Sequence, residues 1–502
     1  FTYLLIKYLY ILIYFMNDLH NINLSERSKL LITYYNELKK TSDKELAFSQ
    51  LGSTTFAKNK KNYINFQKYV FNKLEDFYKK LKVDLCLDSN MDLTKYRKFY
   101  YSSTQEYKNN VKRIYNAHFH NNRYISNETK NFIKNGSLER ENSLLTYELP
   151  YKKTKLIINF FIYKNSGISH KNIAYYDTKA FHMLALVNLI TLLTNNNAIY
   201  ETGDYHICSK DGLNINLFLT PFERIIEQGD KILGAKNVNG GFCYGCVNAG
   251  TIVVYRFEEW FKVFVHECVH NFGVDRYIWK FTSSLKSSFN NEESKIYIDF
   301  INTFNLSNKV NKNTFDLGLQ ECVVEFWGEF LNNAIYSYNY SKHCILSKNA
   351  NKQFEIYYNT FETIIQTEIL HGLLQTTKIL QKNAMNFERM LNVSQTNEKN
   401  SYDETSHLFS YYILKMFITY DYKSFINSEI SLSNDFKIIF NNSEKLETMD
   451  YFFKYIISNF KNPKLISNIQ LVEELYEFLK TNKTCKELQF VVENLRMSVL
   501  EY

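Results

Sequence analysis

An apolar run of helical length carries two histidines and a glutamate at a spacing that could hold a metal ion. The run contains His266-Glu267-Cys-Val-His270. Residues four apart lie one above the other on a helix, so His266 and His270 would present both imidazoles to one point. A helix supplies two nitrogen ligands to zinc in this way, and Glu267 beside them could take a proton from a metal-activated water. The spacing therefore predicts a hydrolytic zinc site.

The surroundings of this pattern support the prediction. With 11 His in 502 residues, a chance match is expected only about 0.02 times along the chain. A strand-like segment, 251–255, precedes the helix, and Glu258 and Glu259 would lie in its first turn, where acids favour the helix dipole. Gly273 stands where a helix commonly ends. The alternative is a pair of buried core histidines that bind no metal.

A second predicted helix, 317–331, carries three glutamates at intervals of four. Glu321, Glu325 and Glu329 share one face, and the residues between them are nearly all apolar. Buried carboxylates are costly unless they are paired or bind metal, so we predict Glu321 as the third zinc ligand. Glu325 would then accept the N–H of a ligand histidine, and Glu329 would lie outside the site.

A segment near residue 410 contains candidates for stabilising the charge that develops during hydrolysis. His407, Tyr411 and Tyr412 would come close together if this segment forms a helix. Their N–H and O–H donors could hold a transition-state oxyanion. The chain has 40 Tyr, however, and packing is the commoner role of such side chains.

The charge and the cysteines bound the classes of function. The formal net charge is +8, and no dense block of Lys and Arg occurs, so we expect no nucleic-acid partner. Eight Cys without a regular framework predict an intracellular, reducing compartment. Cys243 and Cys246 form a lone Cys-x-x-Cys, which we interpret as two ordinary thiols, with a structural zinc site as the alternative.

The first 15 residues are apolar but fit no targeting signal. A membrane span takes about 20 residues, and a signal peptide needs a basic start and a small-residue cleavage site. Met16 followed by a polar stretch resembles a natural start. We therefore interpret residues 1–15 as upstream translation or a disordered leader, with an anchor helix as the alternative, and expect no stable membrane insertion.

Strand-like segments gather just before the predicted metal-binding helix. Segments 155–163 and 213–220 are rich in β-branched and aromatic residues, and 178–194 reads as a buried helix. We predict an α+β fold that is predominantly helical, with a small mixed sheet beside the active-site helix. The expected regions are the leader (1–15), a helical N-terminal region (16–144), a catalytic core (145–335) and a helical C-terminal region (336–502).

Together these residues resemble the gluzincin branch of zinc metallopeptidases, in which His-Glu-x-x-His is paired with a glutamate on a downstream helix. Glu321-Cys-Val-Val-Glu325 is similar to the Glu-x-x-Ala-Glu pattern of lethal-factor-type peptidases, in which the first Glu ligates zinc and the second supports a ligand histidine. The resemblance implies a zincin-like core. Metallopeptidases encoded by nucleocytoplasmic large DNA viruses are also similar, and a viral chain would act in the host cytoplasm or the virion. That similarity covers 175–420 and is carried by the strings at 255–267, 321–328 and 409–415.

One departure from this pattern leaves an alternative open. His-Glu-x-x-His-x-x-Gly also begins the metzincin pattern, and Gly273 is in place. The third metzincin ligand would fall on Arg276, whereas Asp275 is one residue early. A metzincin-like peptidase with an aspartate ligand is therefore the alternative to the Glu321 site.

The expected function is zinc-dependent hydrolysis of peptide bonds, with Glu267 as the general base and a peptide or protein as the substrate. Two other classes remain open. One is a catalytically silent protein on the same scaffold, such as a virion component. The other is a zinc hydrolase of a non-peptide amide.

Overall fold

The computed structural model describes most of the 502-residue chain. The segment interpreted as a leader, 1–15, lies outside the described residues. The described ranges are 24–42, 60–87, 91–122, 124–136, 142–164, 172–194, 198–199, 205–206, 208–227, 229–276, 278–279, 281–282, 292–304, 306, 317–344, 349–391, 402–429, 446–481 and 486–501.

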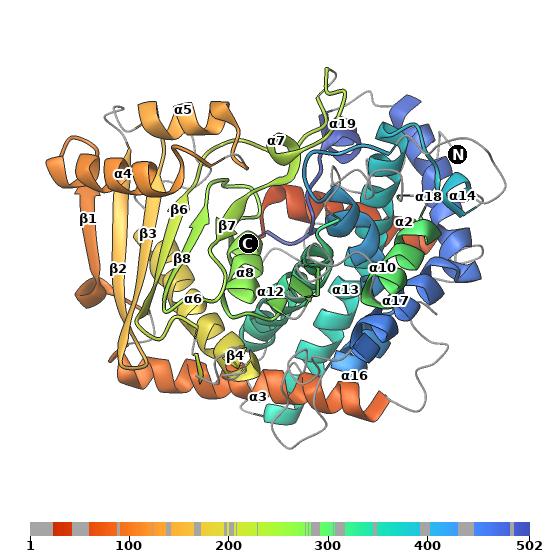
Figure 1. The fold of residues 1–502 in the computed structure, drawn as a ribbon. Helices are drawn as coiled ribbons and strands as arrows, with labels where there is room; N and C mark the ends of the chain where they lie inside the picture. Colours follow the sequence, from red (N-terminus) through yellow and green to blue (C-terminus); the bar gives the residue numbers. More distant parts are fainter. Residues whose placement is uncertain are drawn as a thin grey trace.

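One half of the molecule is built on a mixed six-stranded sheet (Figure 1). In sheet order, its strands are β1 (Arg97–Tyr101), β2 (Ser143–Tyr151), β3 (Thr154–Ile162), β6 (Gly212–Phe218), β8 (Ala249–Val254) and β7 (Gly241–Cys243). β6 pairs in parallel with β3 and β8, and the other pairings are antiparallel. The short β7 therefore forms one edge of the sheet. A separate pair consists of β4 (Ala198–Ile199) and β5 (Tyr205–His206).

Helices make up the other half of the molecule and cover the sheet. Their bounds are α2 (Glu26–Ser42), α3 (Lys60–Asp84), η3 (Thr94–Tyr96), α4 (Gln105–His118), α5 (Asn127–Gly136), α6 (Ile173–Thr194), α7 (Ala235–Val238), α8 (Trp260–Asn271), α10 (Glu292–Thr303), α12 (Leu319–Cys344), α13 (Ala350–Lys382), α14 (Phe387–Leu391), the π-helical η5 (Phe409–Leu414), α15 (Lys415–Tyr420), α16 (Tyr422–Glu429), α17 (Leu446–Phe460), α18 (Pro463–Thr481) and α19 (Lys486–Glu493). α12 packs against α8, α13 and α15. α3 runs beneath both halves (Figure 1) and contacts α6 and α12.

Each face of the sheet has its own hydrophobic core because side chains alternate along a strand. Phe160 points into the larger core, which includes α6 and α8, and its neighbour Phe161 points into a smaller core with α4 and α5. Phe161 stacks on Phe218 of β6, with 4.2 Å between the ring centroids. The sheet is thus covered by helices on both faces, and α8 lies on the face of the larger core.

The α+β class, the predominance of helix and the small mixed sheet are confirmed. Segments 155–163, 213–220 and 251–255 correspond closely to β3, β6 and β8, and 178–194 lies within α6. β1 comes from the region expected to be helical and joins the sheet beside β2. The region boundaries remain predictions.

Two expectations drawn from composition have different outcomes. Among the described residues, no helix combines the length and the apolar character that crossing a membrane requires. The interpretation of Cys243 and Cys246 as two free thiols is wrong for Cys246, which forms a disulfide with Cys208. A hydrogen bond from the Ser209 N–H to the Val247 carbonyl (2.7 Å) joins the same two segments beside the bridge. Cys243 keeps a free thiol.

The contact between α3 and α12 contains an ion pair whose strength depends on pH. Glu75 on α3 pairs with Lys342 and accepts a hydrogen bond from the Tyr338 hydroxyl (2.7 Å). Burial opposes the ionisation of Glu75, but hydrogen bonds from Lys342, Tyr338 and Lys79 outweigh burial and lower its pKa to about 2. Because this pKa lies below the ordinary value of 4.5, the carboxylate stabilises the fold above about pH 4.5. That contribution is lost as the pH falls toward 2.

We expect Glu75→Gln to lower the free energy of unfolding by about 1 kcal/mol at pH 7. The loss should shrink toward zero near pH 2, where the wild-type carboxylate also becomes neutral. Urea unfolding of both proteins at several pH values measures this. An equal loss at pH 7 and pH 2 would show that the ion pair is not the cause.

Candidate metal centre

The helix that carries the two histidines begins later than the sequence predicts. α8 starts at Trp260, after Glu259 in a left-handed conformation with φ 55°. Glu258 and Glu259 therefore do not lie in the first turn. Both bind Arg224 instead, through its backbone N–H (2.6 Å) and its Nη1 (2.6 Å) respectively, because a buried arginine needs carboxylate partners. Gly273, with φ +69°, follows the end of the helix as predicted.

His266, His270 and Glu321 come together between α8 and α12. Their potential ligand atoms all lie within 4.8 Å of one another. Glu321 Oε2 lies 3.4 Å from His266 Nε2 and 3.1 Å from His270 Nε2. Ligands at the usual distance from a tetrahedral zinc are about 3.3 Å apart. Both separations therefore suit a single ion.

Each histidine turns its other ring nitrogen toward a carboxylate. His266 Nδ1 lies 2.8 Å from Glu325 Oε2, and His270 Nδ1 lies 2.7 Å from Asp275 Oδ2. Such outer hydrogen bonds fix the orientation of metal-binding histidines and leave Nε2 for the ion. Glu325 is thus placed as the sequence predicts. Asp275 lies behind His270, outside the group formed by the three candidate ligands, which favours Glu321 as the third ligand.

Two residues that the sequence analysis missed complete the contact between the helices. A Cβ built on Gly328 would lie only 3.2 Å from His266 Cα, so glycine allows α12 to approach α8 closely. Lys262, one turn before His266, forms an ion pair with Glu325, and both side chains are 1 % exposed. The signal was a single lysine in an apolar helix, since a buried ammonium requires a carboxylate partner.

The charges around the two imidazoles favour a cation. Burial alone would lower the pKa of His270, but Asp275 and Glu321 raise it well above its usual value. Burial would raise the pKa of Glu321, but His270 and His266 hold it well below its usual range. Two imidazoles and a carboxylate form a donor set that zinc binds in hydrolases. The residues present therefore fit a zinc ion.

Glu267 lies beside this cluster with a carboxylate suited to carrying a proton. Its side chain is buried and accepts a hydrogen bond from the Cys243 thiol of β7. Burial raises the pKa of Glu267, and the neighbouring histidines offset only part of this rise. A carboxylate with a raised pKa can accept and return a proton near neutral pH more readily than an ordinary one.

The structure brings two of the three candidates near residue 410 to the cluster. The Tyr411 ring lies 6.1 Å from the His266 ring, and the Tyr411 hydroxyl hydrogen-bonds Glu321. His407 Nδ1 lies 4.0 Å from Glu321 Oε1. Tyr412 points elsewhere, since its hydroxyl donates to a backbone carbonyl of the C-terminal segment (2.6 Å). Tyr411 is the best-placed donor of the three.

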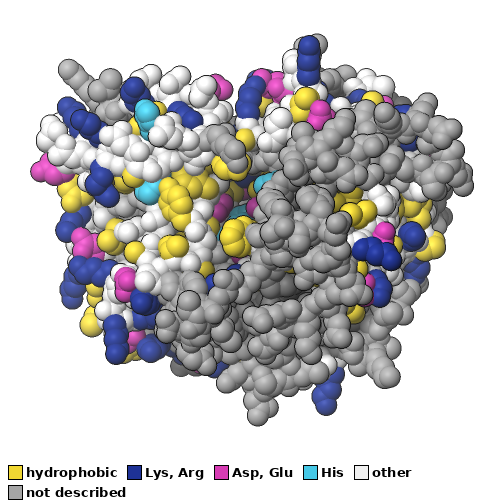
Figure 2. All heavy atoms as spheres, viewed as in Figure 1, with side chains coloured by type: hydrophobic (Ala, Val, Ile, Leu, Met, Phe, Trp, Pro, Cys, Tyr) yellow, Lys and Arg dark blue, Asp and Glu magenta, His cyan; other side chains and the backbone are white. Residues whose placement is uncertain are grey.

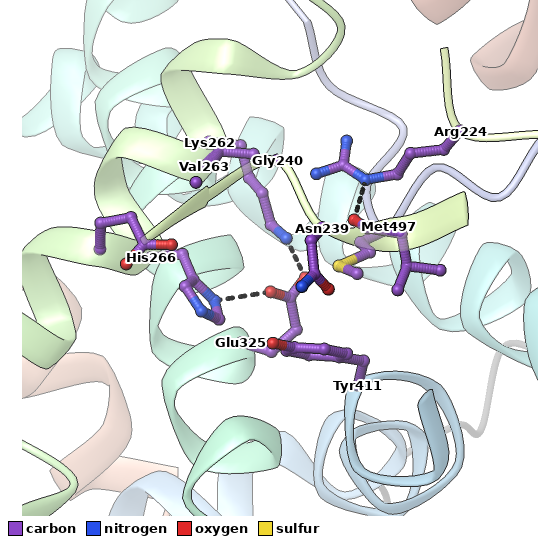
Figure 3. Close-up of a pocket in the computed structure, with 12 residues that line it drawn as sticks. Arg224, Asn239, Gly240, Lys262, Val263, His266, Glu325, Tyr411 and Met497 are labelled. Carbon is purple, nitrogen blue, oxygen red and sulfur yellow. Dashed lines mark hydrogen bonds and ion pairs between the residues drawn. The ribbon is translucent and has the colours of Figure 1, made fainter. Parts of the chain in front are cut away.

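A small pocket opens beside the cluster. Its walls come from the segment after β6, the end of α7, β7 and the loop before it, α8, α12, η5 and the C-terminal segment. In Figure 3, Lys262 and His266 both reach Glu325, with Tyr411 beside that carboxylate. Figure 2 shows histidine and acidic side chains together near the centre of one face, next to a group of hydrophobic side chains.

Comparisons of the chain with protein-family models, with curated proteins and with solved structures find no match. The interpretation of the site as a zinc centre therefore rests on its residues and on their geometry.

Proposed function

We propose that the chain is a zinc-dependent metallopeptidase of the gluzincin type, with a zincin-like core formed by the sheet, α8 and α12. The observation that carries the proposal is the grouping of His266, His270 and Glu321 with Glu267 beside them. Three protein ligands leave one position of a tetrahedral site open, as in catalytic rather than structural zinc sites. The buried carboxylates on the outer ring nitrogens would orient the ligands.

The chain's own residues would supply a base and an oxyanion donor. When bound, zinc would act as a Lewis acid that makes water more acidic and polarises the scissile carbonyl. Glu267 would accept the proton of the attacking water and pass it to the leaving amine. The Tyr411 hydroxyl would donate to the carbonyl oxygen as negative charge develops there.

The sheet edge offers a way to hold an extended substrate. β7 is the last strand of the sheet. It lies directly over α8, because a Cβ built on Gly241 would be 3.1 Å from Glu267 Cγ. An extended peptide could add to this edge through backbone hydrogen bonds. The scissile bond would then lie next to the proposed base.

Removing the Tyr411 hydroxyl tests its role as the oxyanion donor. Tyr411→Phe should lower kcat about a hundredfold, with little change in KM, because the lost hydrogen bond forms mainly in the transition state. Zinc content should be measured in parallel, since the same hydroxyl contacts Glu321.

The neighbouring tyrosine provides the matched control. Tyr412→Phe removes a hydroxyl whose partner lies away from the cluster, so kcat should stay at the wild-type level. Equal losses of kcat in both variants would mean that the segment, rather than the Tyr411 hydroxyl, matters.

Peptide hydrolysis itself can be tested without knowing the substrate. Zinc-loaded protein is incubated with peptides from a digested proteome, and new termini are identified by mass spectrometry. We expect new N-termini that disappear after chelation and return with added zinc. A folded, zinc-loaded chain that produces none would favour the catalytically silent scaffold or a non-peptide substrate.

A further inference from the structure

The pocket beside the metal cluster contains a guanidinium that the proposed hydrolysis does not use. Arg224 is 1 % exposed. Its Nε donates to the Val238 carbonyl (2.6 Å) and its Nη1 to Glu259 Oε2 (2.6 Å). Among the described residues, none hydrogen-bonds its Nη2. This nitrogen lies against Gly240, which also lines the pocket, since a Cβ built on Gly240 would be 2.5 Å from it.

Lys262 adds further donors to the same pocket, and Figure 3 shows it reaching in opposite Arg224. An ammonium group carries three N–H donors, and the one partner of Lys262 among the described residues is Glu325 Oε1. The second oxygen of Glu325 is taken by His266 Nδ1. Both oxygens of the Glu325 carboxylate therefore have partners, whereas Lys262 still has N–H donors without an acceptor in the part of the chain that the structure describes.

The acceptors that Asn239 and Gly240 place on this wall also have partners. The Asn239 carbonyl accepts from Arg256 Nε (2.7 Å), and Asn239 Oδ1 accepts from the Ser406 hydroxyl (2.9 Å). The Gly240 carbonyl accepts from the Tyr255 N–H (2.8 Å). Buried donors without acceptors are unfavourable. The lining also includes the Glu267 carboxylate, which would face the scissile bond in the proposed function. Beside Arg224 and Lys262, the pocket offers unused donors and is matched to a group that brings acceptors.

The pocket lies where the leaving half of a substrate would be. Glu267 forms part of its lining. In the proposed function, on which this inference rests, Glu267 passes its proton to the leaving amine. The residue that carries this amine is the one that follows the cleaved bond. That residue would therefore lie over the pocket.

We propose that the pocket binds a carboxylate of the residue that follows the cleaved bond, through Arg224 Nη2 and Lys262 Nζ. A carboxylate offers two acceptor oxygens and no donor, and its hydrogen bonds to cationic groups are stronger than those between neutral groups. A Lys or Arg side chain would bring further donors beside Arg224 and Lys262, where donors already lack acceptors, and is disfavoured there. The carboxylate is either the side chain of Asp or Glu or the terminal carboxylate of a substrate's last residue.

Two glycine-to-alanine variants test whether a ligand must reach Arg224. One blocks this arginine, and the other makes the same change elsewhere. Gly240→Ala places a methyl group 2.5 Å from Arg224 Nη2 and should block it, whereas a Cβ on Gly229 meets nothing within 4 Å. Binding of N-acetylglutamate methylamide and N-acetylglutamine methylamide to zinc-loaded full-length protein is measured by calorimetry. The Glu probe should bind about tenfold more tightly than the Gln probe. Gly240→Ala should abolish this difference, and Gly229→Ala should keep it.

A third probe distinguishes the two sources of the carboxylate. N-acetylalanine carries only a terminal carboxylate, and N-acetylalanine methylamide carries none. A preference for N-acetylalanine over its amide that Gly240→Ala abolishes would assign the pocket to chain ends and the enzyme to carboxypeptidases. If Gly240→Ala weakens binding of the Glu probe only, the pocket binds acidic side chains. A preference that survives Gly240→Ala reflects a carboxylate on the metal and overturns the proposal, as does equal binding of charged and neutral probes.

A second pair of variants covers the case in which Gly240→Ala does not fold. Arg224→Lys keeps a positive charge but cannot retain its two anchoring bonds and also reach the pocket, so the preference should again be lost. Arg113→Lys, the same change at an exposed position of α4, is the control. Probe binding can be measured without turnover, so the peptidase proposal and the pocket proposal can be refuted independently of each other. Carboxylate binding without peptide cleavage would refute the peptidase alone, and cleavage without carboxylate binding would refute the pocket alone.

Discussion

Glu267→Gln is expected to remove most peptide hydrolysis while the fold and the zinc content stay unchanged. Glutamine keeps the size of the side chain and can still accept the Cys243 hydrogen bond, but it cannot take up a proton. Loss of a general base typically costs about a hundredfold to ten-thousandfold in rate. Burial raises the pKa of Glu267, so the neutral amide should be tolerated in the folded state.

The measurement is kcat/KM on a peptide identified in the proteome digest, with zinc per chain and thermal unfolding recorded on the same samples. Glu106→Gln makes the same chemical change at an exposed position of α4 and should leave all three quantities at wild-type values. A Glu267→Gln variant with full activity would refute the assignment of Glu267 as the base. Lost activity together with lost zinc would instead show a structural role.

The parts of the site that could be predicted from sequence depend on helical spacing. Residues four apart lie one above the other on a helix. His266 and His270 therefore share one face of α8, and Glu321 and Glu325 share one face of α12. Spacing alone could not bring the two helices together. The apolar residues around the glutamates indicated burial, and a buried carboxylate needs a partner. The histidine pair, which needs a third ligand to hold a zinc ion, is such a partner.

The contacts that could not be predicted join segments far apart in the chain. Glu259 looked like a favourable residue in the first turn of a helix, yet it pairs with Arg224, 35 residues earlier. The metzincin-like pattern makes Asp275 a candidate zinc ligand. In the structure, Asp275 instead lies behind His270. Such pairings depend on loop paths, which local propensity does not encode. The disulfide of Cys246 belongs to the same class.

Lys262 shows where more could have been predicted. A lysine in the middle of an apolar helix cannot remain buried without a partner, and the stripe of glutamates on α12 supplies several. Pairing the buried lysine of one helix with a buried carboxylate of the other would have fixed the register between them. Lys415 in α15 repeats the arrangement with Glu329, outside the metal cluster. Matching buried charges between helices is therefore a usable signal in this fold.

Glu321→Ala is expected to reduce bound zinc from about one per chain to well below one. Glu321 Oε2 is within 3.4 Å of both ligand nitrogens, so alanine leaves only two protein ligands, fewer than the three of a catalytic zinc site. The loss of a buried carboxylate also removes its interactions with both histidines. The protein should remain folded, because apolar side chains of α8 and α12 pack across the same contact. Zinc is measured by elemental mass spectrometry after dialysis.

Asp275→Ala is the variant that decides between the two candidate third ligands. If Asp275 only orients His270, its loss should weaken zinc binding about tenfold to a hundredfold, and saturating zinc should restore one ion per chain. Glu321→Ala should not recover in this way. The reverse pattern, with zinc retained in Glu321→Ala and lost in Asp275→Ala, would assign Asp275 as the ligand. That result would require a movement of Asp275 from the Nδ1 side of His270 to the Nε2 side, where Glu321 now lies.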